Sequence, residues 1–475
     1  MINPKIRLAL CVLVLLAFLP ACSGFAKKPA LQLKACTVGN YPAQCGQLQV
    51  YEDRASQKGR QIELNLAVIR ANPPQKAAGA IFLLSGGPGV AATQDTGNIP
   101  LVTLLPDRDV VLVDQRGTGG SNEVYPPPTP DWSGLGPQEL EKAYAGWIKK
   151  TLPRLKADVR FYTTSLAMDD LDDVRQALGY EKIDLVGGSY GTTAAQYYLR
   201  QHEEHVRSVV LLSGSVGNLP IWENQAANAQ KALEALFARC ESDSRCQEAY
   251  PNVRSEFAAL LEQLTAQPLT IGQGNDQVTL TAELFAAKVE DMLRDAQRSS
   301  GLPRLIHKAY AEADWSAWGP ASYGDWSGSI MSYSIQCNEA WAAFSPEATA
   351  RLGQGSFLLG WNLSRADRYT LICKYLPPGW TPAGENEQPP SQVPVLLFNG
   401  EVDPLDPPAN AALARQIWPN SLSLTLAGQG HNLSDGTTVI CVMQISRQFI
   451  KTASIANLNT DCLKNIHPPS FATYP

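Results

Sequence analysis

The feature that most constrains the fold of this chain is the stretch LVGGSYGTTAAQYY at residues 185–198. An apolar run, typical of a strand buried on both faces of a sheet, passes through GGSYG directly into an Ala-rich segment that predicts a helix. Glycines on both sides of Ser189 permit a turn too sharp for larger side chains. G-x-S-x-G between a strand and a helix is the pattern of a nucleophile elbow, so we predict that Ser189 is a catalytic nucleophile.

The same alternation of strand and helix extends along much of the chain. Short apolar runs end in glycine-rich turns at 80–89 and 109–121, and helical spacing follows over 163–180. This order predicts an α/β fold with a mostly parallel central sheet. We expect a lead-in with a small cysteine loop over residues 23–60.

Residues 218–390 interrupt this alternation with mainly helical patterns and with loops rich in Trp, Gly and Pro. The strand pattern returns at 393–404 and 422–431, and 439–450 has the spacing of a closing helix. We therefore predict two parts of one core, residues 23–217 and 391–475, with a helical cap at 218–390 inserted between them.

The N-terminus has the form of an export signal. Lys5 and Arg7 precede an apolar run at 8–19, which is too short for a comfortable membrane span. The following Leu-Pro-Ala-Cys resembles a bacterial lipobox, so residues 1–22 are expected to be a lipoprotein-type signal with Cys22 as the lipidated residue. Plain secretion after cleavage is the alternative. Serine at position 23, by resemblance to the bacterial sorting rule, favours the outer membrane.

The cysteine count agrees with export. Setting aside Cys11 and Cys22, the chain keeps an even number of cysteines, which in an exported protein indicates disulfides. We hypothesise nearest-neighbour pairing, with free buried thiols as the alternative for some of them: 36–45, 240–246, 337–373 and 441–462.

Charge and motif spacing argue against nucleic-acid binding and against a zinc site. The formal net charge of −6 and the lack of a basic cluster disfavour a nucleic-acid partner. His202 and His205 stand in an H-x-x-H pair, which differs from the H-E-x-x-H of zinc proteases and has no evident third ligand in the sequence. We therefore expect no metal site and no organic cofactor, and membrane contact only through the N-terminal lipid.

A serine hydroxyl needs a general base and an acid that orients that base. His431 lies in a glycine-rich turn after a late strand, and we predict it as the base. Asp403, just past the strand at 393–400, is the predicted acid, with Asp406 as the alternative. The oxyanion hole is expected to use the N–H groups of Tyr190 and of Gly87 in the loop SGGPG, with Gly86 as the alternative.

Five motifs, in the order GGPG, DQRGTGGS, GGSYGT, NGEVDPLDPP and GQGH, resemble the prolyl iminopeptidase and tripeptidyl aminopeptidase branch of the α/β-hydrolases. The resemblance covers about residues 35–465, and Ser85 departs from it, because many prolyl iminopeptidases have His there. Asp114 and Arg116 of DQRG are expected to hold their loop by internal hydrogen bonds. The resemblance implies that a cap acid binds the substrate amine, and Glu339 in SIQCNEAW is the candidate.

These observations together predict a serine aminopeptidase that releases residues from the N-termini of short peptides through an acyl-enzyme. An esterase or other small-molecule hydrolase on the same scaffold is the first alternative, because a serine triad hydrolyses esters as well as amides. A non-catalytic envelope binding protein is the second. The expected location is the envelope of a Gram-negative-type bacterium, either lipid-anchored or as a periplasmic or secreted protein.

Overall fold

The structure is a computed structural model. It describes residues 31–72, 79–95, 107–127, 132, 135–217, 221–272, 277–319, 329–340, 344–381 and 389–473. The predicted signal segment 1–22, with Cys22, lies outside the described residues.

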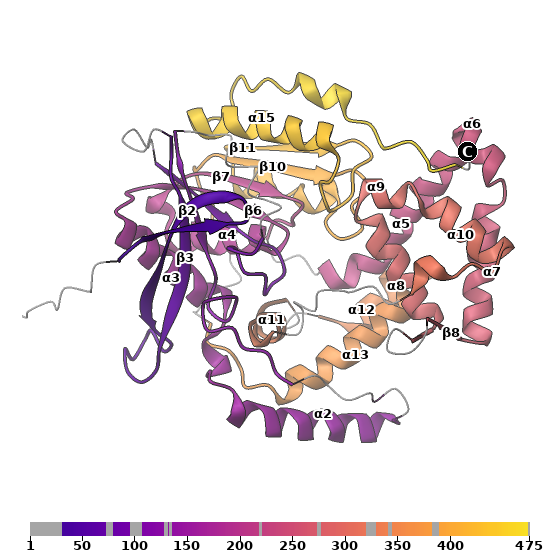
Figure 1. The fold of residues 1–475 in the computed structure, drawn as a ribbon, viewed down its shortest axis with the longest axis horizontal. Helices are drawn as coiled ribbons and strands as arrows, with labels where there is room; N and C mark the ends of the chain where they lie inside the picture. The colour runs from indigo at the N-terminus through magenta and orange to yellow at the C-terminus, as the bar shows by residue number, and fades with distance from the viewer. Residues whose placement is uncertain are drawn as a thin grey trace, which may run out of the picture.

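One large sheet forms the centre of the core (Figure 1). Its strands are β1 (Lys34–Val38), β2 (Tyr41–Tyr51), β3 (Gln61–Ile69), β4 (Ala80–Leu84), β5 (Asp109–Val113), β6 (Ile183–Gly188), β7 (Val206–Leu212), β10 (Val395–Gly400) and β11 (Ser421–Leu426). They lie in the order β1-β2-β3-β5-β4-β6-β7-β10-β11. Pairing is parallel from β5 to β11 and antiparallel from β1 to β5. The predicted α/β fold with a mostly parallel sheet is confirmed.

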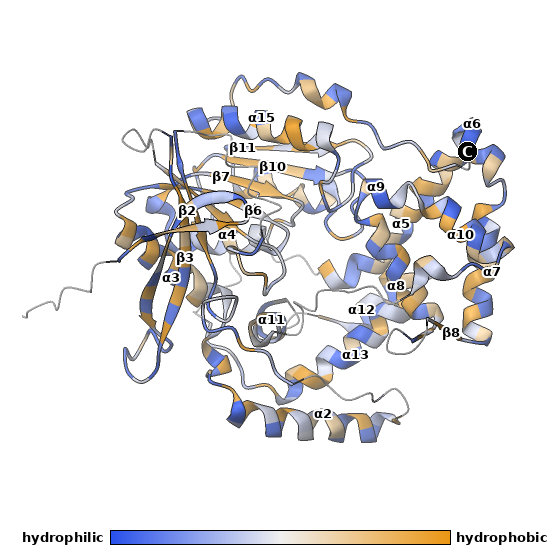
Figure 2. Ribbon diagram, viewed as in Figure 1, coloured by the Kyte–Doolittle hydropathy of each residue, from blue (hydrophilic) through white to orange (hydrophobic). Residues whose placement is uncertain are grey.

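Helices cover both faces of this sheet. Helices α3 (Thr164–Leu178) and α4 (Tyr190–Gln201) pack on one face, and α15 (Gly436–Thr452) packs on the other. Every residue of β4 and β5 is consequently buried, which accounts for the apolar runs 80–84 and 110–113. Asp109, the first residue of β5, is the buried exception and pairs with Arg70 and Tyr180. Figure 2 shows polar and apolar residues side by side on the outer helices, as expected of helices with one face in solvent. The short helix α14 (Ala414–Ile417) lies between β10 and β11 in the chain.

The chain between β7 and β10 is mainly helical and lies beyond the carboxyl ends of β10 and β11 (Figure 1). Its longer helices are α5 (Ile221–Ser242), α7 (Val253–Ala266), α8 (Ala282–Leu293), α10 (Leu302–Ala311) and α13 (Leu359–Tyr375). Shorter elements are α6 (Ser244–Ala249), α9 (Ala296–Ser299), α11 (Ile330–Ile335), α12 (Pro346–Leu352), a π-helical turn (Gln336–Ala340) and the hairpin of β8 (Leu269–Ile271) and β9 (Val278–Leu280). A separate apolar cluster, with Phe257, Phe285 and Trp318 among its members, fills its interior.

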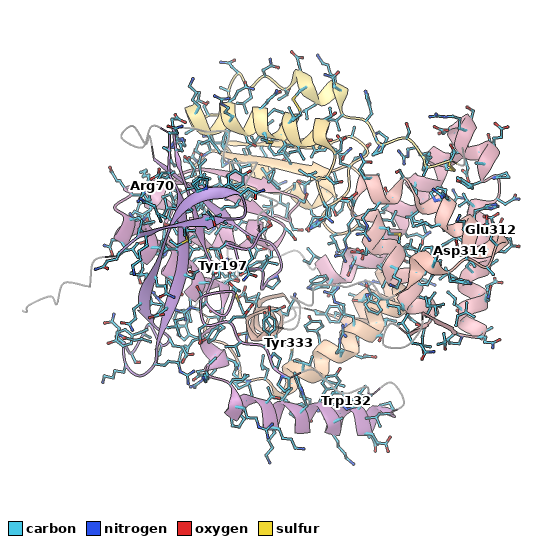
Figure 3. The ribbon with its side chains drawn as sticks, viewed as in Figure 1. Arg70, Trp132, Tyr197, Glu312, Asp314 and Tyr333 are labelled. Carbon is cyan, nitrogen blue, oxygen red and sulfur yellow. A yellow bond between two sulfur atoms is a disulfide. The ribbon has the colours of Figure 1, made fainter. Side chains whose placement is uncertain are left out.

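The helices α2 (Pro137–Thr151) and α11 make contacts that join this helical part to the core. Helix α2 packs Tyr144 and Ile148 against Ile372 of α13. Tyr333 of α11 lies between the core and α13, where its ring centroid is 6.1 Å from that of Tyr369 (Figure 3). The helix α11 and the π-helical turn after it are therefore held against the sheet side of the molecule.

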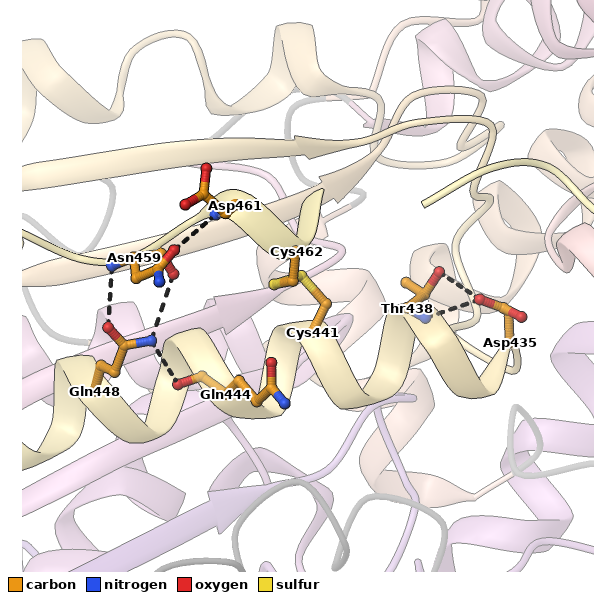
Figure 4. The surroundings of a disulfide bond; sticks show 8 residues. All are labelled: Asp435, Thr438, Cys441, Gln444, Gln448, Asn459, Asp461 and Cys462. Carbon is orange, nitrogen blue, oxygen red and sulfur yellow. Dashed lines mark hydrogen bonds between the residues drawn. A yellow bond between two sulfur atoms is a disulfide. The ribbon is translucent and has the colours of Figure 1, made fainter. Parts of the chain in front are cut away.

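Four disulfides have the hypothesised nearest-neighbour pairing: Cys36–Cys45, Cys240–Cys246, Cys337–Cys373 and Cys441–Cys462. Their Cα–Cα distances, between 5.1 and 5.8 Å, are ordinary for disulfides. Figure 4 shows the last of them beside a hydrogen bond of 3.0 Å from Asn459 N to Gln448 Oε1, so the segment after α15 is tied back to that helix twice.

The structure differs from the sequence-based expectation at residues 34–51. These residues form two antiparallel strands that extend the sheet, with the Cys36–Cys45 disulfide joining them, where we expected only a lead-in with a cysteine loop. The strand β2 lies near the edge, and several of its side chains are exposed or half-buried, so it lacks the apolar run that marked the central strands.

Candidate active site

The turn between β6 and α4 holds Ser189 in a backbone conformation that few residues other than glycine adopt. Its φ is 53° and its ψ is −123°. Ser189 N donates to the carbonyl of Leu212 at 2.9 Å, and Thr192 N donates to the carbonyl of Ser189 at 2.8 Å. Backbone strain of this kind persists where the surroundings enforce it and is common at functional sites. The sharp strand-to-helix turn predicted from GGSYG is present.

Backbone packing explains the glycine after the elbow. A Cβ on Gly191 would lie 2.1 Å from the carbonyl oxygen of Leu84 in β4. We therefore expect Gly191→Ala to push α4 away from β4, to cost about 1–3 kcal/mol of unfolding free energy and to slow any reaction of Ser189. Thermal unfolding and the rate of fluorophosphonate labelling measure the two effects. The matched variant Gly146→Ala adds a methyl to α2 where nothing lies within 4 Å, so it should raise stability slightly through helix propensity and leave the labelling rate unchanged.

Ser189, His431 and Asp403 form one hydrogen-bonded chain, although the serine and the histidine are 242 residues apart in sequence. His431 Nε2 lies 3.0 Å from Ser189 Oγ, and His431 Nδ1 lies 2.9 Å from Asp403 Oδ2. Because a carboxylate only accepts, Nδ1 carries the proton and Nε2 is left to accept from the serine hydroxyl. This is the geometry that a serine nucleophile and its base require.

The acid and the base are each fixed by backbone groups. Asp403 Oδ1 accepts hydrogen bonds from Leu405 N at 2.8 Å and from Asp406 N at 2.9 Å. Asn432 N, next to the histidine, donates to the carbonyl of Arg294 at the end of α8 at 2.7 Å. The turn that carries His431 is thus tied to the helical part of the chain as well as to the sheet.

Burial and neighbouring charges shift the pKa of His431 in opposite directions. Burial favours the neutral ring, but the charge of Asp403, its hydrogen bond and the nearby Asp406 together raise the pKa of His431 above its ordinary value. Asp406, the alternative acid, has Oδ2 at 3.8 Å from the same Nδ1. The structure therefore places Asp403 in direct contact with the base and Asp406 just beyond it.

The loop SGGPG lies directly beside the nucleophile. A Cβ on Gly86 would be 3.3 Å from Ser189 Cβ and 3.8 Å from Ser189 Oγ, so the backbone of this loop passes close to the hydroxyl. Tyr190 is the first residue of α4, and the first N–H groups of a helix lack partners within it. Both predicted sources of an oxyanion hole are therefore at the serine, and the choice between Gly86 and Gly87 stays a prediction.

Glu339 reaches the same region from the π-helical turn. Its Oε1 accepts a hydrogen bond of 2.7 Å from Thr164 N, in the first turn of α3, where the helix dipole favours an anion. Thr164 Oγ1 in turn lies 2.7 Å from the hydroxyl of Tyr190. Burial and the charge of Glu339 raise the pKa of Tyr190 well above its ordinary value, so its phenol stays neutral. The structure thus brings Glu339 to the residue that follows the nucleophile.

Comparison with known proteins agrees with the fold described above. The family model described as the alpha/beta hydrolase fold matches residues 79–436, which is most of the chain. The chain belongs to the α/β-hydrolase fold family. Like other members, this hydrolase carries its candidate nucleophile and histidine at the ends of parallel strands.

Curated relatives resemble this hydrolase over part of their length. The chain is 27% identical to YuaR of Escherichia coli (strain K12) over 47% of itself and 48% of that protein. It is 30% identical to the proline iminopeptidase of Heyndrickxia coagulans over 38% of itself and 50% of that protein. It is 28% identical to the tripeptidyl aminopeptidase of Streptomyces coelicolor over 36% of itself and 35% of that protein. The match thus spans half of these relatives or less, and their names agree with the resemblance that the motifs indicated.

The DQRG loop of this hydrolase is held by buried charges, as predicted. Asp114 accepts from Thr93 N at 2.8 Å and from Gly120 N at 3.0 Å. The Arg116 guanidinium makes two hydrogen bonds to the Asp170 carboxylate, at 2.7 and 2.8 Å, and a third to the carbonyl of Phe161. Neither Asp114 nor Arg116 exposes any surface, so both residues support the fold.

The structure brings a third possible ligand to His202 and His205, where the sequence showed none. Asp172 in α3 lies beside these histidines, and ligand atoms of all three residues are within 4.8 Å of one another. However, Arg175 Nε donates to Asp172 Oδ1 at 2.6 Å, and Arg175 also lies 3.4 Å from His205 Nε2. Because a guanidinium already neutralises this carboxylate, we assign the group to the packing of α3 against α4.

The other two histidines lie apart from the site. His307 pairs with Glu256 inside the helical part at 3.0 Å, and His467 is exposed near the C-terminus. No helix in the described part of the chain combines the length and the hydropathy that crossing a membrane requires.

Proposed function

We propose that this protein is a serine hydrolase that removes residues from the free N-termini of short peptides. The observation that carries the proposal is the hydrogen-bonded chain from Ser189 through His431 to Asp403. The relatives named as peptidases and the position of Glu339 support a peptide with a free amine as substrate.

The first chemical step follows from these distances. Ser189 Oγ attacks the scissile carbonyl while His431 Nε2 takes the hydroxyl proton, and Asp403 stabilises the resulting imidazolium without accepting its proton. His431 then gives that proton to the leaving amine. An acyl-enzyme remains, and a water molecule activated by the same histidine releases it.

Backbone N–H groups stabilise the charge that develops on the carbonyl oxygen. The Tyr190 N–H at the start of α4 is one donor, and the second comes from the SGGPG loop. Both belong to rigid turns, so little reorganisation is needed when the oxyanion forms.

Glu339 is proposed to bind the protonated α-amine of the peptide. Its Oε1 accepts the hydrogen bond from Thr164 N at the start of α3, where the helix dipole favours an anion, and the Cys337–Cys373 disulfide lies close to it in the chain. Charge-assisted hydrogen bonds in a site with little water are stronger than neutral ones. An amine held at a fixed distance from Ser189 would restrict cleavage to a few residues from the N-terminus.

A peptide library with free and acetylated N-termini tests this function. Mass spectrometry of the products should show release only from free N-termini. Glu339→Gln keeps the acceptor for Thr164 N but removes the charge, so we expect kcat/KM for free peptides to fall about 10- to 100-fold. Turnover of a p-nitrophenyl ester, which has no amine, should change little.

Glu256→Gln is the control, because Glu256 is another glutamate of the helical part, and it is buried and pairs with His307. It should not alter the preference for a free amine. Equal losses on free and acetylated peptides in Glu339→Gln would reduce Glu339 to a structural role. A wild-type protein that turns over esters and no peptide would make the aminopeptidase proposal wrong.

We also propose that the protein acts outside the cytoplasm, in the cell envelope. Four disulfides support an oxidising compartment, because cytoplasmic thiols are kept reduced. Lipidation at Cys22 would then provide the attachment to the membrane.

A further inference from the structure

Two carboxylates face the same nitrogen of the candidate base. His431 Nδ1 lies 2.9 Å from Asp403 Oδ2 and 3.8 Å from Asp406 Oδ2. Both acids follow β10 in a single turn, and the N–H of Asp406 donates to Asp403 Oδ1 at 2.9 Å. A triad needs one acid, so the second carboxylate requires an explanation.

Asp406, like Asp403, is held in place by hydrogen bonds. Its side chain is buried, and its Oδ1 accepts a hydrogen bond from Ser215 Oγ, which follows β7. Asn410 Nδ2 lies 3.5 Å from the same oxygen. Asn399 Nδ2, from the end of β10, donates to the backbone carbonyl of Asp406 at 2.9 Å. These contacts occupy Oδ1 and leave Oδ2 on the side of the imidazole.

We propose that Asp406 is a second positioning carboxylate for His431, which shares the imidazolium with Asp403. The proposal rests on the proposed function, in which His431 becomes an imidazolium during catalysis. Asp406 touches neither the substrate nor the serine and acts only through the histidine.

The charges around Asp406 determine what it does at different pH values. Asp403 and His431 face Asp406 directly, and Arg294, which follows α8 and pairs with Glu290, interacts electrostatically with both Asp403 and His431. Burial, followed by the charge of Asp403, raises the pKa of Asp406 to about 6. Above that pH the Asp406 carboxylate is ionised, and its charge then favours the imidazolium form of His431.

This arrangement has two opposite consequences for activity. The base must be neutral before reaction, so a second carboxylate moves the rise of kcat/KM with pH toward higher pH. The same carboxylate stabilises the imidazolium once it has formed, so it raises the rate on the plateau. A purely structural residue would change the plateau without moving the pH at which activity rises.

Asp406→Asn separates these possibilities, because it keeps an acceptor for Ser215 and removes the charge. We expect the acidic limb of kcat/KM for a p-nitrophenyl ester to move down by about one pH unit and the plateau to fall about tenfold. Ser215→Ala retains the carboxylate but removes a hydrogen bond that lowers the pKa of Asp406. Ser215→Ala should move the acidic limb of kcat/KM in the same direction by a smaller amount. It therefore serves as a second variant if Asp406→Asn folds poorly.

Asp403→Asn tests whether Asp406 can orient the histidine alone. In a triad with a single acid, replacing that acid lowers kcat about 10⁴-fold. With Asp406 within reach, we expect a smaller loss, and the double variant Asp403→Asn/Asp406→Asn should lose the remainder. Asp461→Asn is the control, because Asp461 is exposed and pairs with Lys464 far along the chain, and its pH profile should match that of the wild type.

An acidic limb that stays at the wild-type pH in both Asp406→Asn and Ser215→Ala would overturn the proposal. So would an Asp403→Asn variant no more active than the double variant. Fluorophosphonate labelling of the wild type separates this failure from failure of the proposed function. A wild type that is labelled, with an unmoved limb, contradicts only the role of Asp406, whereas an unlabelled wild type contradicts the hydrolase itself.

Discussion

Ser189→Ala is expected to lower kcat by about 10⁴- to 10⁶-fold on every substrate that the wild type hydrolyses. The hydroxyl lies 3.0 Å from His431 Nε2, and the alanine leaves the base with no nucleophile to activate. His431→Ala should cost a similar factor. Because the two groups act as one unit, the double variant should be no worse than either single variant. Steady-state kinetics on one ester and one peptide measure all three.

Ser446→Ala provides the matched control for this prediction. Ser446 is a buried serine of α15, on the face of the sheet opposite α4, and its loss should leave kcat unchanged. Additive losses in the double variant, or a Ser189→Ala protein with near wild-type turnover, would show that hydrolysis occurs elsewhere.

Asp170→Ala is expected to lower the free energy of unfolding by about 3–5 kcal/mol, because it removes the charged partner of a buried guanidinium. Arg116 exposes no surface, and Asp170 receives two of its hydrogen bonds. Removing the carboxylate leaves the buried Arg116 guanidinium with hydrogen bonds to the backbone carbonyls of Glu52 and Phe161 and without the charge of Asp170. Urea-induced unfolding, followed by fluorescence, measures the change.

Asp173→Ala is the control for this variant. Arg54 pairs with both Asp170 and Asp173, at 2.8 Å in each case. The Asp173 side chain is 18% exposed, so its loss should cost about 1 kcal/mol or less. The double variant Arg116→Met/Asp170→Leu removes both charges, and it should recover part of the stability that Asp170→Ala loses. Equal unfolding midpoints for Asp170→Ala and Asp173→Ala would contradict the assignment of the DQRG loop as a buried support.

Local sequence patterns carried most of the information about the core. The turn around Ser189 was predictable because its requirements are local: a buried strand before it, a helix after it and residues small enough for close backbone contact. The strands β4 and β5 were predictable for a similar reason, since burial on both faces favours apolar residues at nearly every position. The histidine was predictable because few histidines follow a strand in a glycine-rich turn.

Elements that lack such a local pattern were missed or had no predicted bounds. The helix α13 lies within the segment 218–390 that was predicted as mainly helical, but its buried residues Asn362, Ala366, Tyr369 and Ile372 do not form a strong apolar stripe that would mark it. The strand β2 lies next to the edge strand and is stabilised by its pairing with β1 and β3 and by a disulfide. In both cases tertiary contacts supply what the local sequence does not.

The relations between distant residues required the structure. Glu339 and Thr164 are 175 residues apart, and no pattern in either segment indicates that a carboxylate meets the start of α3. Asp406 was recognisable as an acid near the site, but its distance from His431 depends on how the turn after β10 is folded. Sequence thus predicted the chemical groups, and the structure was needed for their geometry.

Mapping of a fluorophosphonate adduct tests the central claim most directly. The wild-type protein is labelled, digested and analysed by mass spectrometry, in parallel with His431→Ala. We expect one adduct, on the peptide that contains Ser189, and a labelling rate at least about 10³-fold lower without the histidine. An adduct on another residue, or a labelling rate that does not depend on His431, would contradict the catalytic chain proposed here.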